Sequence, residues 1–136
     1  MFSYFEKQPD GKYRSKGDLI AKFRQAGYTV ALLFVGLANE AISILRVETR
    51  REQGGHAVPT EKLQQRFPRT QKAIRMAAPL ADLTLMFDNS RTPEKAFSLV
   101  RVQAKSSIYY DCRTSNISDK ELVRIAKVWL STVAPE

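Results

Sequence analysis

Four arginines between positions 46 and 69 have the spacing and the chemistry to bind an anion. Arg46 and Arg50 are four residues apart, so they share one face of a predicted helix. Arg66 and Arg69 are three apart on the next predicted helix. Stacked like charges are destabilising without an anion nearby, and planar guanidinium groups match phosphate oxygens. The alternative is a solvated basic face paired with neighbouring acids: Glu48, Glu52 and Glu61.

Gly54-Gly55-His56 separates the two helices. Two glycines allow positive φ, close approach to a ligand, or a hinge for a moving lid. The alternative is an ordinary helix end, for which one glycine suffices. His56 is the single histidine of the chain and a candidate catalytic or cofactor-binding residue, although a lone loop histidine more often makes a structural hydrogen bond.

Asp88-Asn89-Ser90 follows the short apolar run Leu83–Phe87, a predicted buried strand. In parallel α/β sheets, ligands bind beyond the carboxyl ends of the strands, where polar side chains can hold a base or a phosphate. The alternative is a turn and helix cap. Cys112 has no nearby histidine, so it is interpreted as structural or incidental. No cluster has metal-ligand spacing, and no metal site is predicted.

The formal net charge of +8 favours phosphate, nucleic-acid or acidic-protein partners. Most of this excess lies between Arg46 and Arg75, where basic residues outnumber acidic ones by five. The basic residues of this segment are Arg46, Arg50, Arg51, Lys62, Arg66, Arg69, Lys72 and Arg75.

The helices and strands expected to position these residues indicate one α/β domain. The continuous apolar run Thr29–Leu37 predicts a central parallel strand with both faces buried. A helix before it, capped by Ser15 and ended by Gly27, is expected to bury its apolar side chains: Leu19, Ile20 and Phe23. The helix–strand order favours an α/β layer fold.

Capping residues and prolines predict where the remaining helices begin and end. Asn39 is the predicted cap of the first basic helix, and Pro59 or Thr60 begins the second. Pro68 is expected to bend or end that helix, with a further one over 70–78. Phe97–Gln103 and Ser107–Asp111 form a predicted hairpin. The last helix carries a Ser118/Glu121 capping box and an apolar stripe: Leu122, Ile125, Ala126, Trp129, Leu130 and Val133.

The bulk properties fit a single domain over 1–136. With one cysteine, no intrachain disulfide is possible, which favours a reducing compartment. No apolar run approaches the roughly 18–20 residues of a membrane span, and the first residues do not resemble a signal peptide. The sequence therefore predicts a cytoplasmic protein without membrane contact.

Together these motifs resemble the zeta-toxin-like P-loop kinases. The resemblance rests on Arg46-Val47-x-x-Arg50-x-x-x-Gly54-Gly55-His56-x-Val58-Pro59, on Arg66-Phe67-x-Arg69 and on Phe87-Asp88-Asn89-Ser90. The preceding run, from Ala26-Gly27-Tyr28 to Phe34-Val35-Gly36-Leu37, is similar to the strand before this motif. The match covers the lid and core portion, roughly 14–90, and leaves 91–136 as a C-terminal hairpin and amphipathic helix.

The resemblance implies a partial P-loop nucleoside-kinase-like three-layer fold with parallel core strands. It implies transfer of the γ-phosphate of ATP, with Mg²⁺, to a sugar hydroxyl, typically of UDP-N-acetylglucosamine. The family's lid arginines, which stabilise the transferring phosphoryl group, match Arg46, Arg50, Arg66 and Arg69. Gly54-Gly55-His56 would belong to the mobile lid, and Asp88-Asn89 would lie near the adenine end of the nucleotide.

The sequence departs from the family in lacking the phosphate-binding loop G-x-x-x-x-G-K-[ST] and the catalytic aspartate that follows it. Phe2-Ser3 corresponds to the end of a segment after that loop. The first hypothesis is therefore a kinase fragment, inactive alone or completed by another chain. The alternative is a basic, non-catalytic module that binds nucleic acid or an acidic protein such as an antitoxin. A sheet that lacks a strand also suggests homodimerisation at its exposed edge.

Overall fold

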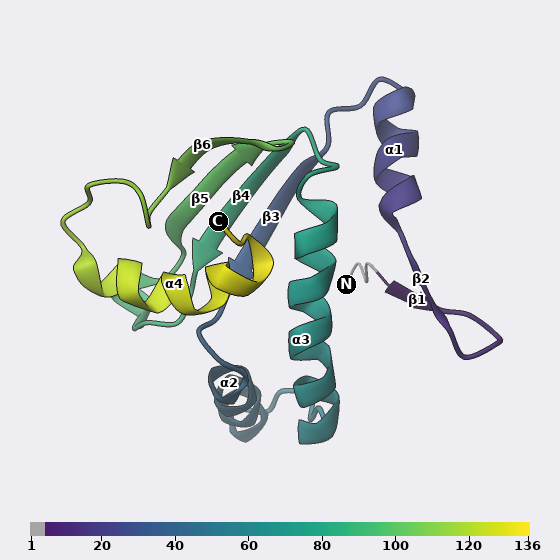
Figure 1. Ribbon diagram of the computed structural model, residues 1–136. Coiled ribbons are helices and arrows are strands. Elements are labelled where there is room, and N and C mark those ends of the chain that lie inside the picture. The colour runs from purple at the N-terminus through teal and green to yellow at the C-terminus, as the bar shows by residue number, and fades with distance from the viewer. Residues whose placement is uncertain (1–4) are drawn as a thin grey trace.

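The computed structural model describes residues 5–136, so the expected counterpart of Phe2-Ser3 lies outside the described residues. Its elements run along the chain in a mixed α/β order (Figure 1). They are β1 (Phe5–Lys7), β2 (Tyr13–Ser15), α1 (Gly17–Gln25), β3 (Ala31–Gly36), α2 (Glu40–Glu52), α3 (Thr60–Ala77), β4 (Leu83–Asp88), η1 (Pro93–Lys95), β5 (Ser98–Ala104), β6 (Ser107–Asp111) and α4 (Lys120–Val133).

The main sheet has four strands in the order β3-β4-β5-β6. β3 and β4 are parallel, with Leu33 opposite Leu85, and this confirms the predicted parallel pair. β5 runs antiparallel to β4 and to β6, which confirms the C-terminal hairpin. The register shifts between Met86 and Phe87 and again between Val102 and Gln103. The fold is therefore α/β with a mixed sheet.

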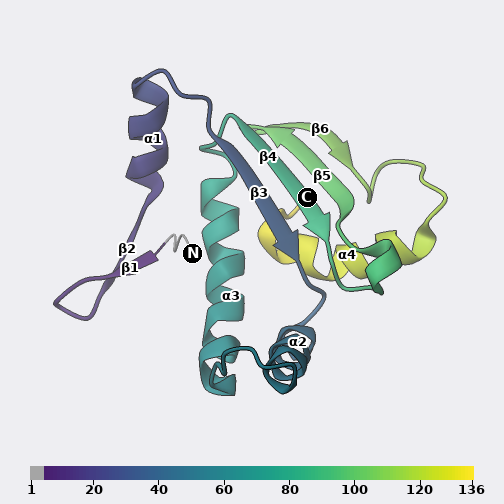
Figure 2. The ribbon, with the colours of Figure 1, turned by 180° about the vertical axis from the view of Figure 1, so that it is seen from behind.

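Helices α3 and α4 cover one face of this sheet, and the core lies beneath them (Figures 1 and 2). Trp129 of α4 is its largest fully buried side chain. Its ring meets Phe34 edge-on at a centroid distance of 5.6 Å. A Cβ added to Gly36 would lie 2.6 Å from the indole ring, so β3 can approach α4 only with glycine at this position. The apolar stripe predicted for α4 is confirmed.

The prediction that both faces of the first core strand are buried is wrong. In the described chain β3 is the outer strand of the sheet, and its side chains alternate between exposed and half-buried. Leu33 is 67% exposed because no described helix covers that face. Residues 5–136 thus form two layers, a sheet and helices on one side of it.

The burial predicted for α1 is also partly wrong. Ile20 is buried, whereas Leu19 and Phe23 are exposed, because α1 stands beside the sheet rather than on it (Figure 1). It is held by Arg24, whose Nε donates to Asp82 Oδ1 at 2.9 Å. Ser15 belongs to β2 and does not cap the helix. Gly27 follows the helix end at φ +87°, as predicted.

Two other boundary predictions need correction. α3 continues through Pro68 as one helix, so Pro68 does not end it. The second half of α3 packs through Ala73 and Ala77, which are buried, and this packing outweighs the cost of an internal proline. The cap of α4 is Asp119 rather than Ser118, and its carboxylate accepts a hydrogen bond from Leu122 N at 2.9 Å.

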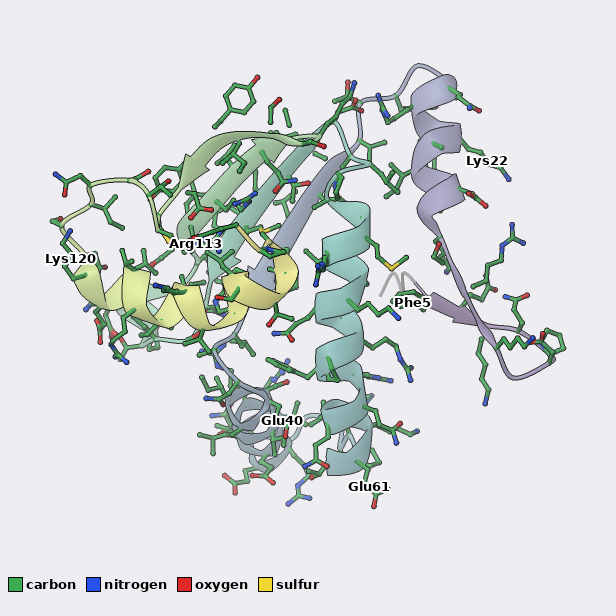
Figure 3. The ribbon with its side chains drawn as sticks, in the orientation of Figure 1. Phe5, Lys22, Glu40, Glu61, Arg113 and Lys120 are labelled. Carbon is green, nitrogen blue, oxygen red and sulfur yellow. The ribbon has the colours of Figure 1, made fainter. Side chains whose placement is uncertain are left out.

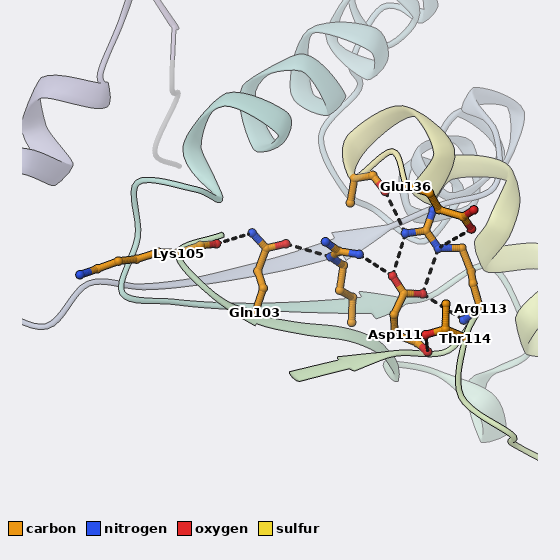
Figure 4. Close-up of polar contacts among 8 residues, drawn as sticks. Gln103, Lys105, Asp111, Arg113, Thr114 and Glu136 are labelled. Atoms are coloured by element: carbon orange, nitrogen blue, oxygen red, sulfur yellow. Dashed lines mark hydrogen bonds and ion pairs between the residues drawn. The ribbon is translucent and has the colours of Figure 1, made fainter. Parts of the chain in front are cut away.

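A row of charged and polar side chains is buried at the end of α4 (Figure 4). Asp111 accepts hydrogen bonds from the guanidinium groups of Arg101 and Arg113. Arg101 also donates to Gln103 Oε1 at 2.8 Å, and Arg113 to Ala134 O at 2.9 Å. This network joins the β5–β6 hairpin to α4 and explains how two arginines are tolerated in the interior.

Among the described residues, no helix combines the length and the apolar character needed to cross a membrane.

Candidate functional site

The candidate site is built around α2, which follows directly on β3. Asn39 caps this helix as predicted, and its side chain accepts a hydrogen bond from Ile42 N at 3.1 Å. No residue of α2 is buried. The helix therefore presents Arg46 and Arg50 on a surface rather than in a core.

Both glycines of the Gly54-Gly55-His56 segment are needed to end α2. Gly54 has φ +89° and donates to Arg51 O at 3.0 Å, while Gly55 donates to Arg50 O at 2.8 Å. This pair of bonds is a Schellman motif. A Cβ on Gly55 would lie 2.7 Å from Arg50 O. His56 is exposed in the loop beyond. The helix-end interpretation therefore accounts for both glycines, and their role in a lid stays a prediction.

The loop between α2 and α3 lays the two basic helices side by side, away from the sheet (Figures 1 and 2). Arg50 and Arg66 are exposed, and Arg46 and Arg69 are half-buried. Side chains of both helices extend outward, with Glu40 and Glu61 marking the first turns (Figure 3). The four predicted arginines thus lie on neighbouring helices.

Most arginines outside these two helices have a carboxylate partner, although Arg124 of α4 forms no ion pair within residues 5–136. Arg14, Arg24, Arg91, Arg101 and Arg113 each form an ion pair with a carboxylate. Within residues 5–136, by contrast, no ion pair is formed by Arg46, Arg50, Arg51, Lys62, Arg66, Lys72 or Arg75. The alternative interpretation required pairing with Glu48, Glu52 and Glu61, and no such ion pair occurs in the described chain.

The loop after β4 is held by the fully buried carboxylate of Asp88. Its Oδ2 accepts a hydrogen bond from Trp129 Nε1 at 2.8 Å and one from Ser90 Oγ at 2.9 Å, and its Oδ1 accepts one from Ser90 N at 3.0 Å. Ser90 Oγ in turn accepts from Ala38 N at 2.8 Å. Asp88 therefore fixes the position of Asn89 and of the start of α2.

Arg46 joins the basic helix to this loop, because its guanidinium donates to Asn89 O. A hollow of about 450 Å³ opens at this junction. It is lined by Arg46, Asn89, Arg91, Pro93, Ala96 and Phe97. The structure thus brings together two of the predicted site residues, Arg46 and Asn89, at the carboxyl ends of β3 and β4.

Arg91 and Phe97 were not singled out from the sequence. Arg91 has a 5% exposed side chain and pairs with Asp119 at 2.8 Å. Burial lowers the pKa of its guanidinium, but hydrogen bonds to Asp119 and Glu121 raise it above its usual value. Its Nε has no hydrogen-bond partner in the described chain. A basic residue directly after Asp88-Asn89-Ser90 was the available signal.

Phe97 is 60% exposed at the rim of the hollow and has φ +52°. A positive φ is unusual for a residue with a bulky side chain, and such strain is often found at ligand sites. The side-chain amide of Asn89 has no hydrogen bond within residues 5–136. The hollow thus offers an aromatic face, an amide and the guanidinium of Arg46, which suit a planar, anionic ligand, whereas the guanidinium of Arg91 is already paired with Asp119.

The other candidate groups have little chemistry of their own. Burial raises the pKa of the Cys112 thiol to about 11, so it is protonated and unreactive at neutral pH. Within the part of the chain that the structure describes, no three or more His, Cys, Asp and Glu side chains form a group suited to a metal ion. The candidate site within the described residues therefore consists of basic, amide and aromatic side chains.

Models of known protein families, curated proteins and solved structures gave no significant match to this chain.

Proposed function

We propose that the protein binds a nucleotide or a nucleotide sugar through α2, α3 and the loop after β4, as the lid and core of a zeta-toxin-like kinase with a P-loop-kinase-like fold. The observation that carries this proposal is the contrast in ion pairing. Within residues 5–136, no ion pair is formed by seven cations of α2 and α3, namely Arg46, Arg50, Arg51, Lys62, Arg66, Lys72 and Arg75, whereas five arginines elsewhere form one. Unpaired guanidinium groups on neighbouring helices favour the binding of a phosphate group.

We expect the base of the ligand to lie in the hollow and its phosphates to lie against α2 and α3. An aromatic ring such as Phe97 can stack on a base, and a free amide such as that of Asn89 can pair with the edge of a base. Arg46 lies at the junction between this hollow and α2, so phosphates leaving the hollow would meet Arg46 and then Arg50. Arg66 and Arg69 on α3 would complete the binding of the phosphates.

The chain's own residues suit ATP phosphates better than Mg²⁺. Arginines are available for phosphate oxygens, but no acidic cluster suited to a metal occurs in the described residues. The sequence contains no G-x-x-x-x-G-K-[ST] motif. We therefore expect binding of UDP-N-acetylglucosamine or ATP, but no phosphorylation by this chain alone, and no catalytic step is assigned to Mg²⁺.

Replacing Arg50 with alanine is expected to weaken ligand binding about tenfold or more, because a charge-assisted hydrogen bond to phosphate contributes about 1.5–3 kcal/mol. Arg50 is exposed, and its side chain bonds only to Arg46 O within the described chain, at 3.2 Å. Stability should therefore hardly change. Isothermal titration calorimetry with UDP-N-acetylglucosamine and with ATP measures the effect.

Arg14→Ala is the matched control, because Arg14 is an exposed arginine in a surface ion pair far along the chain from the site. It should leave both titrations unchanged. Absence of binding of either ligand to the unmodified protein at millimolar concentration would contradict the proposal. Phosphorylation of UDP-N-acetylglucosamine by this chain would show that the missing loop is not essential.

A second candidate function is sequence-independent binding of nucleic acid along α3. This helix is one continuous rod of 18 residues, or about 27 Å, and four of its cations lie free of ion pairs in the described chain. They are Lys62, Arg66, Lys72 and Arg75. Cations spread along a helix of this length can contact phosphates of a nucleic-acid backbone.

Lys72→Glu is expected to weaken binding of duplex DNA or RNA severalfold and to reduce its salt dependence, because one or more phosphate contacts are lost. Lys22→Glu is the control, since Lys22 is also exposed but lies on α1 (Figure 3). Gel shifts at low and moderate salt provide the measurement. Binding that does not respond to salt would count against a phosphate interface, and an acidic protein partner such as an antitoxin would then be the remaining macromolecular candidate.

A further inference from the structure

One loop forms most of the wall of the hollow and has little apolar packing to hold it. Residues 89–97 connect β4 to β5 and supply every residue that lines the hollow except Arg46. Residues 92–95 of this loop are exposed. A second hollow, of about 490 Å³, is lined by the same loop together with Glu121 and Ile125 of α4. Polar contacts must therefore fix the position of the loop.

Arg91 makes the strongest of these polar contacts. Its side chain is 5% exposed. Nη1 donates to Asp119 Oδ2 at 2.8 Å and to Glu121 Oε2 at 3.4 Å, while Nη2 donates to Ser98 Oγ at 2.9 Å. These partners belong to the start of α4 and to the first residue of β5. The η1 turn of the loop lies beside the start of α4 (Figure 2).

Asp119 joins the loop to a helix that is itself fixed in the core. Its Oδ1 accepts a hydrogen bond from Leu122 N at 2.9 Å and caps α4, while its Oδ2 accepts from Arg91. These two hydrogen bonds lower the pKa of Asp119, so its carboxylate is charged at neutral pH. Trp129, which is 1% exposed, packs α4 against the sheet. The position of the loop therefore depends on α4.

Lys95 also joins the loop to α4, but its contact differs in burial. Its Nζ donates to Glu121 Oε2 at 2.9 Å, and the two side chains are 53% and 50% exposed. Exposed ion pairs contribute little to stability, because water screens the charges and two long side chains lose freedom. Arg91 rather than Lys95 is therefore the residue that fixes the loop.

We propose that Arg91 is a positioning residue, which holds residues 89–97 against α4 so that Asn89 and Phe97 line the hollow in the arrangement that binds the ligand. Its Nη1 and Nη2 have protein partners and its Nε is buried, so Arg91 has little to offer an anion although it lines the hollow. The inference rests on the proposed nucleotide binding. It adds that this binding requires α4, which lies outside the segment that resembles the kinases.

Two substitutions distinguish positioning from direct contact with the ligand, and isothermal titration calorimetry with UDP-N-acetylglucosamine and with ATP measures both. Arg91→Lys keeps the positive charge but loses the planar guanidinium that reaches Asp119 and Ser98 together. Asp119→Asn keeps a side chain that can cap α4 but removes the charge that holds Arg91. Positioning predicts that each weakens binding about tenfold, because the site is no longer preorganised.

Direct contact between Arg91 and a phosphate predicts a different pattern. Arg91→Lys would then bind nearly as well as the unmodified protein, and Asp119→Asn would bind more tightly because it releases the guanidinium. Lys95→Ala is the matched control, since Lys95 lies in the same loop and pairs with the same helix. It should change the affinity by less than about twofold.

Amide hydrogen exchange of residues 89–97, followed by mass spectrometry, tests the positioning without a ligand. In this loop Lys95 N donates to Thr92 O at 2.9 Å and Ala96 N to Pro93 O at 3.2 Å. Exchange should be faster in Arg91→Lys and in Asp119→Asn, because the loop opens more often. It should be unchanged in Lys95→Ala.

Unmodified affinity in Arg91→Lys, tighter binding by Asp119→Asn, or unchanged exchange in both variants would each overturn the inference. Failure of the unmodified protein to bind either ligand would instead contradict the proposed function, and the exchange rates would then decide whether Arg91 holds the loop. Circular dichroism checks folding. If Arg91→Lys does not fold, Asp119→Asn decides the question, because the Asp119 side chain is 41% exposed.

Discussion

Asp111→Ala is expected to lower the free energy of unfolding by about 3–5 kcal/mol, because it leaves buried guanidinium charges without their partner. Arg101, Asp111 and Arg113 all have side chains no more than 7% exposed. Arg113 donates to Asp111 through Nε at 2.9 Å and Nη2 at 2.7 Å, and Arg101 donates through Nη1. Urea unfolding followed by circular dichroism measures the change.

Asp18→Ala is the control for the Asp111 variant. Asp18 also pairs with an arginine, Arg14, but at 3.4 Å and with both side chains at least 70% exposed. Exposed pairs contribute about 0–1 kcal/mol, so this substitution should hardly change stability. Equal effects of the two substitutions would show that the Arg101–Asp111–Arg113 network does not stabilise the fold as the structure indicates.

The carboxylate of Asp111 also makes the stability of the protein depend on pH. Burial raises the pKa of Asp111, but hydrogen bonds from Arg113 and Arg101 outweigh it, so the net pKa lies below its usual value. A lowered folded-state pKa stabilises the protein above the unfolded pKa of about 3.9, and this stabilisation is lost as pH falls through the folded-state pKa. Stability should therefore fall below about pH 4, and this decline should be shallower in Asp111→Asn.

Trp129→Ala is expected to destabilise the protein by about 3–5 kcal/mol, the usual cost of removing a buried aromatic side chain. The indole is 1% exposed, packs against Phe34 and lies against Gly36 of β3. Its removal leaves a cavity between α4 and the sheet and takes a hydrogen bond from the buried carboxylate of Asp88. Thermal and urea unfolding give the magnitude.

Val128→Ala is the neighbouring control on α4, and because Val128 is 60% exposed it should change stability by less than about 0.5 kcal/mol. Trp129→Phe keeps most of the packing but removes the donor to Asp88 Oδ2. If Asp88 positions Asn89 for ligand, Trp129→Phe should weaken nucleotide binding while the protein stays folded. Unchanged binding would show that the hydrogen bond from Trp129 to Asp88 does not contribute to ligand binding.

The parts of the fold that follow local rules were predictable. The parallel strand pair, the hairpin, the Asn39 cap and the stripe of α4 depend on periodicity and capping chemistry within short stretches. The sequence predicts Ser118 as the cap of α4, whereas Asp119 makes the bond, because neighbouring cap formers compete and only the geometry selects one. The sequence predicts a bend or an end at Pro68, but α3 continues through it because tertiary packing outweighs the local preference.

The sequence indicated where the candidate site lies and some of its residues, but not all the residues that line it. The spacing of Arg46 and Arg50, and the position of Asp88-Asn89 after a buried strand, pointed to the region where the hollow lies. Arg91 and Phe97 join it only because the chain turns back toward α2 after β4. Whether the four arginines bind one ligand stays a prediction, to be decided by the titrations.

The sequence by itself determined that α2 and α3 would be basic, that glycines would end α2, and that a polar loop would follow β4. These properties belong to single segments, so they can be read without knowing the fold. Only the tertiary structure decided which charges have partners, because ion pairing depends on residues far apart in the chain. It paired Arg101 and Arg113 with Asp111 and left Arg50 and Arg66 without a carboxylate among the described residues. That difference separates the arginines that stabilise the fold from those that we propose to bind a ligand.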